Sequence, residues 1–111
     1  MTPARREGFE KQWQQMLEAF AQQNWQTAFY HLENAHVLGQ PSTRLHVRSH
    51  WWMLKVAWCQ GNSREVVGQW LRITAALLFS RIWVPVGNTG GANVSAIKPM
   101  PVRDELKVYL Q

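Results

Sequence analysis

The stretch HLENAHVLGQPSTRLHVRSH, residues 31–50, decides the fold and contains all four histidines of the chain. Its centre, GQPS at residues 39–42, is expected to be a tight turn, because glycine ends helices and proline cannot continue one. The residues on both sides have helical character, so the turn predicts an antiparallel helical hairpin. Such a hairpin brings histidines from the two sides of the turn together.

Capping residues and apolar spacing extend this hairpin to four helices, expected over about 3–22, 25–39, 43–60 and 63–83. The expected N-caps are Thr2, Asn24, Ser42 or Thr43, and Asn62. Pro3 suits the first position of the first helix, and Glu65 stands at capping-box spacing from Asn62.

An internal repeat with an offset of 38 residues supports this organisation. It pairs Trp13 with Trp51 and Asn24 with Asn62, among other positions, and the histidines are not part of it. The repeat predicts an all-α fold of two antiparallel helical hairpins in a four-helix, tetratricopeptide-like array.

Residues 84–103 are rich in proline and glycine and have no helical period, so we expect an extended, irregular segment that lies over the bundle. A short terminal helix over 104–111 follows. The string GNTGGAN at 87–93 could cradle an anion through its backbone N–H groups or could be an ordinary structural loop.

Length and composition limit the classes of protein to which the chain can belong. The 111 residues, 46% hydrophobic and 17% charged, suit a single globular domain. The net charge of +5 permits contact with nucleic acid, acidic proteins or anionic lipid without selecting among them. The single Cys59 excludes an internal disulfide, and neither a secretory signal nor a membrane-spanning run is apparent. We therefore expect a soluble cytoplasmic protein.

The histidines suggest a metal site, because imidazole is the commonest protein metal ligand. His46 and His50 are four residues apart on one helical face, and the hairpin places His36 opposite them. This triad is the candidate ligand set for zinc, copper or nickel, with His31 or Glu33 as a fourth ligand; a carboxylate would suit iron. The alternatives are a purely structural histidine cluster and a pH-sensitive contact.

Other features point to partners rather than to catalysis. Trp51 and Trp52 are adjacent on one helix, so they cannot both face the same core, and an exposed tryptophan favours a protein-interaction adaptor or a homodimer. Arg44, Arg48 and Lys55 form a basic stripe, but no nucleic-acid reader motif accompanies it. The residues show no acid–base pair and no activated nucleophile, which argues against an enzyme.

Four strings resemble a bacterial family of small uncharacterised proteins, domain of unknown function 3703: HLENAHVLGQ (31–40), HVRSHWWML (46–54), REVVGQ (64–69) and PVGNTGGANVS (85–95). The resemblance covers most of residues 9–103 and includes the four histidines, Glu33 and Glu65. It implies no activity, because the family has none assigned.

Overall fold

A computed structural model of the chain describes residues 1–79, 88–92, 94 and 99–110. Their elements are α1 (Pro3–Ala21), α2 (Trp25–Gly39), α3 (Thr43–Gln60), α4 (Ser63–Phe79) and the 3₁₀ helix η1 (Asp104–Leu110). These residues contain no strand. The predicted all-α fold is thereby confirmed.

Side-chain caps begin the helices at the predicted positions. Thr2, Asn24 and Ser42 each accept a hydrogen bond from the backbone N–H three residues later. Asn62 does the same for the N–H of Glu65. Gly61 ends α3 with a φ of 71°, a left-handed conformation that glycine adopts without a steric penalty. The helical prediction for residues 80–83 lies outside the described residues.

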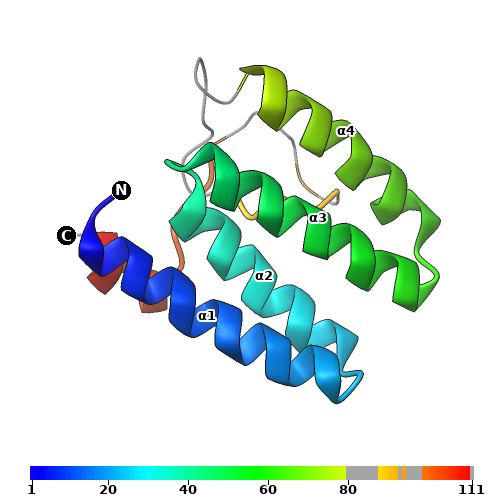
Figure 1. Cartoon of the computed structure of the whole chain (residues 1–111), viewed down its shortest axis with the longest axis horizontal. Helices are drawn as coiled ribbons and strands as arrows, with labels where there is room; N and C mark the ends of the chain where they lie inside the picture. The colour runs from blue at the N-terminus through cyan, green and yellow to red at the C-terminus, as the bar shows by residue number, and fades with distance from the viewer. Residues whose placement is uncertain (80–87, 93, 95–98, 111) are drawn as a thin grey trace.

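The four α-helices lie side by side in chain order, with α1 and α4 at opposite edges of the array (Figure 1). Neighbouring helices pack in pairs, as the hairpin pattern predicts, whereas a tetratricopeptide-like geometry stays a prediction. The main core lies among α1, α2 and α3, and its largest fully buried side chains include Phe9, Met16, Leu32, Leu38 and Met53.

The terminal helix η1 closes the core over α1 and α2. Leu106 is fully buried there. Gly8 allows the close approach, because a Cβ at this position would lie 2.6 Å from the Tyr109 ring. The described parts of residues 88–103 are non-helical. No described helix has the length and apolar character needed to span a membrane.

Candidate metal centre

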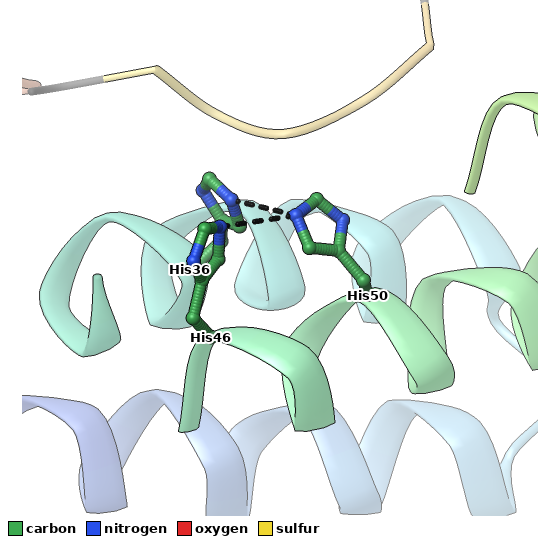
Figure 2. Close-up of side chains that lie close together, drawn as sticks. All are labelled: His36, His46 and His50. Carbon is green, nitrogen blue, oxygen red and sulfur yellow. Dashed lines mark hydrogen bonds between the residues drawn. The ribbon is translucent and has the colours of Figure 1, made fainter. Parts of the chain in front are cut away.

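Three imidazoles converge where the end of α2 meets the start of α3 (Figure 2). His36 comes from α2, and His46 and His50 come from the first two turns of α3. The Nε2 atom of His50 lies 3.1 Å from Nε2 of His36 and 3.2 Å from Nε2 of His46. All three residues are buried, with exposed fractions of 2, 7 and 3%. The hairpin therefore directs three nitrogen atoms to one buried point.

The second nitrogen of His36 is held by a backbone carbonyl. Its Nδ1 lies 2.8 Å from the carbonyl oxygen of Asn88. A carbonyl oxygen can only accept, so Nδ1 carries the proton and donates it. In the neutral ring Nε2 then presents a lone pair toward the other two histidines.

His50 is fixed by a longer chain of hydrogen bonds. The Gln69 amide nitrogen donates to Glu65 Oε2 at 2.7 Å and to the Gly90 carbonyl at 2.9 Å. These two acceptors set the orientation of the amide, so Gln69 Oε1 faces His50 Nδ1 at 2.6 Å. Nδ1 of His50 must therefore donate to it, and Nε2 of His50 also presents a lone pair.

Two lone pairs thus face each other at 3.1 Å, and neither ring has a proton to place between them. His46 can donate one proton from its Nε2 to Nε2 of His50. The other nitrogen of His46, Nδ1, is buried and has no hydrogen-bond partner. A metal ion at this point would take up the three Nε2 lone pairs, and Nδ1 of His46 would then carry that ring's proton. At metal–nitrogen bonds of about 2.0–2.1 Å, tetrahedral ligands lie about 3.3 Å apart, close to the separations found here.

Burial also keeps these rings neutral. Desolvation lowers the pKa of His46 to about 4, and that of His50 to about 3 with a further contribution from the His46 charge. Desolvation, followed by repulsion from the other two imidazoles, lowers the pKa of His36 well below its ordinary value. The neutral imidazole is the form that binds metal. Protons therefore compete weakly for this site near neutral pH.

The comparisons with known proteins agree with the sequence resemblance. The chain matches the family described as protein of unknown function (DUF3703) over residues 3–110. The chain belongs to this family. No curated protein and no solved structure matches the chain.

In this DUF3703 chain, the segment 88–92 covers the histidines, and the gold ribbon above the rings in Figure 2 follows its path. Gly90 has a φ of 88°, and a Cβ there would lie 2.7–2.9 Å from three atoms of the His36 ring. The N–H of Gly90 donates to Asn88 Oδ1, and that of Ala92 donates to Glu65 Oε2. These two N–H groups are thus used inside the protein, which favours the structural interpretation of the loop over the anion cradle. Residues 87 and 93 lie outside the described residues.

The two predicted auxiliary ligands lie in other contacts. His31 Nδ1 is 2.8 Å from Gln12 Oε1, and His31 is not part of the converging group. Its ring starts about 140° around the helix from His36, which explains the different direction. Glu33 Oε1 accepts from Arg103 at 3.3 Å, and Glu33 is likewise not part of the group.

The sequence did not identify the residues that surround the triad. Glu65 was expected only to close a capping box by accepting the N–H of Asn62, but that N–H donates to the carbonyl of Ala57. The Oε2 atom of Glu65 instead accepts hydrogen bonds from Gln69 and Ala92. One signal was present in the sequence: Glu65 and Gln69 are polar residues at i, i+4 spacing, so they lie on one face of their helix. The backbone acceptors of Asn88 and Gly90 carry no such signal.

Proposed function

We propose that this protein binds one transition-metal ion through Nε2 of His36, His46 and His50, for sequestration or sensing. The observation that carries the proposal is the pair of Nε2 lone pairs held 3.1 Å apart in a buried site. A buried polar atom is costly without a partner, so a site of this kind is expected to have a cation as its occupant.

The surrounding hydrogen bonds support the same function. Metal-binding histidines usually donate their other N–H to a carbonyl or carboxylate, which fixes the ring and makes it a better ligand. His36 donates to the Asn88 carbonyl, and His50 donates to Gln69, which in turn is bonded to the Glu65 carboxylate. The ligand rings are therefore preorganised by contacts from α4 and from the 88–92 segment.

The donor set suits zinc, copper or nickel, because imidazole is a ligand of intermediate softness. No thiolate or carboxylate joins the converging group among the described residues, so the site itself has no negative charge. Glu65 supplies one negative charge at the end of the Gln69 link and offsets part of the charge of a buried ion. The segment 88–92 covers the site, which favours storage or sensing over turnover.

The test is a titration of protein purified without a histidine tag, followed by elemental analysis. At pH 7.5, where even ordinary imidazoles are mainly neutral, we expect about one zinc, copper or nickel ion per chain. The His50→Ala variant should lose most of the binding, and His31→Ala, the matched control outside the group, should keep it. Equal binding by a variant that lacks all three triad histidines would refute the proposal.

A second function, a helical adaptor that binds another protein, is favoured by the exposure of Trp51, Trp58 and Trp70, at 42, 73 and 52%. Trp52, by contrast, packs edge-on against Trp13 at 5.7 Å. The two functions do not exclude each other, because the tryptophans are exposed on α3 and α4, whereas the triad is buried.

Nucleic-acid binding has less support. Two residues of the basic stripe lie over aromatic rings of the protein itself: the Arg48 guanidinium is 4.4 Å from the Trp13 ring and the Lys55 ammonium 4.1 Å from the Trp52 ring. Such cation–π contacts give the stripe a role in packing.

A further inference from the structure

The outward face of α4 is mostly apolar between positions 67 and 78. Positions 67, 70, 71, 74, 77 and 78 fall within about 120° of the helix circumference at roughly 100° per residue. All but Thr74 are apolar. Their exposed fractions are 59% for Val67, 52% for Trp70, 67% for Leu71, 63% for Leu77 and 64% for Leu78. A surface helix normally turns such a stripe toward the core, so this face is exceptional.

Two tryptophans of α3 widen this surface. The Trp51 ring meets the Trp70 ring edge-on, with centroids 5.9 Å apart. Trp58 and Val67 both line a cavity of about 300 Å³ between the end of α3 and the start of α4. We call the combined surface of these two tryptophans and the five apolar α4 residues the α4 outer face.

Its area is the size of a protein interface. With about 250 Å² for a fully exposed tryptophan, the three tryptophans present about 400 Å². The four aliphatic side chains are each about two-thirds exposed and roughly double this area. The total reaches the ~800 Å² that each partner buries in a standard interface. Apolar patches on monomeric proteins are usually about 300–600 Å² at most.

The opposite edge of the array argues for a particular occupant. Figure 1 shows α1 at that edge, and its exposed residues include Glu7, Glu10, Lys11, Gln14, Gln15 and Glu18. Stacking α4 of one chain on α1 of the next would bury these polar groups against leucine and tryptophan. Two copies of the α4 outer face, by contrast, match each other. The face itself has no charged side chain: Arg64 lies at its rim at one end of α4, and Arg44 and Arg48 border it on the Trp51 side of α3.

We propose that the α4 outer face is the interface of a two-fold symmetric homodimer, in which α4 packs against α4 of a second copy. An isologous interface of this kind closes after two subunits. The proposal does not depend on the metal site, since the triad is buried and meets α4 through Gln69, which is not part of the α4 outer face.

Sedimentation velocity of the full chain from about 1 to about 100 µM tests the proposal, because interfaces of this size can be as weak as micromolar. We expect a dimer whose dissociation constant rises at least about tenfold in Leu71→Glu. Val108→Glu is the matched control: Val108 is 62% exposed on η1, away from α4, and its substitution should leave the dimer unchanged.

Acrylamide quenching of the tryptophan fluorescence at the same concentrations reports on the face directly. Comparison of the unmodified protein with the Trp58→Phe and Trp70→Phe variants isolates the signal of Trp58 and Trp70, which we expect to be protected only in the dimer. Three results would overturn the proposal. One is a monomer throughout the range, whether its tryptophans are open or are covered by its own chain. Another is a dimer that Leu71→Glu does not weaken. The third is a monomer that binds anionic vesicles through this face.

Discussion

Acid should destabilise the metal-free protein steeply, because three buried histidines must be neutral in the folded chain. Burial depresses their folded pKa values, whereas each ring takes up a proton near pH 6.5 once the chain unfolds. The unfolded state then binds more protons than the folded state below about pH 6.5. The stability that these rings contribute is complete above that pH and is lost as the pH falls toward 4.

The size of the loss follows from the number of rings. A group that is protonated only in the unfolded chain costs about 1.4 kcal/mol per pH unit. Between pH 7 and pH 5.5 this amounts to about 1.2 kcal/mol for each histidine and about 4 kcal/mol for the triad, starting from the ordinary pKa of about 6.5. Glu33 acts in the opposite direction, because burial raises the pKa of its carboxyl group. The loss is a large part of the ~5–15 kcal/mol that stabilises a typical domain.

Urea unfolding of chelator-treated protein, followed by tryptophan fluorescence at both pH values, measures this loss. His31→Asn serves as the control: burial lowers the pKa of this half-buried ring as well, so its removal should reduce the pH dependence, but by less than the removal of a triad ring. His46→Asn should reduce it by about one third, since one of three titrating rings is removed. A free energy of unfolding that is equal at pH 7 and pH 5.5 would refute the buried neutral triad.

Three further predictions concern the surroundings of the triad and the basic stripe. Gly90→Ala places a Cβ against the His36 ring at a positive φ, so it should cost about 1–3 kcal/mol in urea unfolding and weaken metal binding in calorimetry. Glu65→Gln removes the charge behind Gln69 and should lower metal affinity by about tenfold or more, with unchanged circular dichroism. Arg44→Glu with Arg48→Glu should leave metal affinity unchanged, and gel shifts of the unmodified protein should show no DNA binding tighter than about 10⁻⁴–10⁻⁶ M at physiological salt. Nanomolar, sequence-dependent binding would contradict the last of these.

The sequence predicted those features that depend on near neighbours in the chain. Thr2, Asn24 and Ser42 cap the helices because each cap needs only a side-chain oxygen and an N–H three residues away. The meeting of His36 with His46 and His50 required one more step, the antiparallel hairpin, and the turn at 39–42 supplies it. Fold and triad were thus accessible from local patterns.

The surroundings of the triad were not accessible, because they depend on where a distant segment crosses the helices. Asn88 acts through its carbonyl and Gly90 through its carbonyl and its small size, and every residue has a carbonyl. The auxiliary role predicted for Glu33 assumed that it points to the triad, whereas its carboxylate meets Arg103, 70 residues later. Long-range ion pairs of this kind have no spacing rule.

The helix α4 has a distribution of polar and apolar residues that is partly the reverse of that expected for a surface helix. Its inner face contains Glu65 and Gln69, which are buried, together with the half-buried Arg72, although apolar residues would pack there at lower cost. Its outer face carries tryptophan and leucine, where charged residues would keep a lone monomer in solution more easily. Stability alone explains neither face. Glu65 and Gln69 are accounted for by the need to orient His50, and the exposed apolar residues by a second copy of the chain. Substitutions on the two faces should therefore separate cleanly: Glu65→Gln should change metal affinity and leave the dimer intact, and Leu71→Glu should do the reverse.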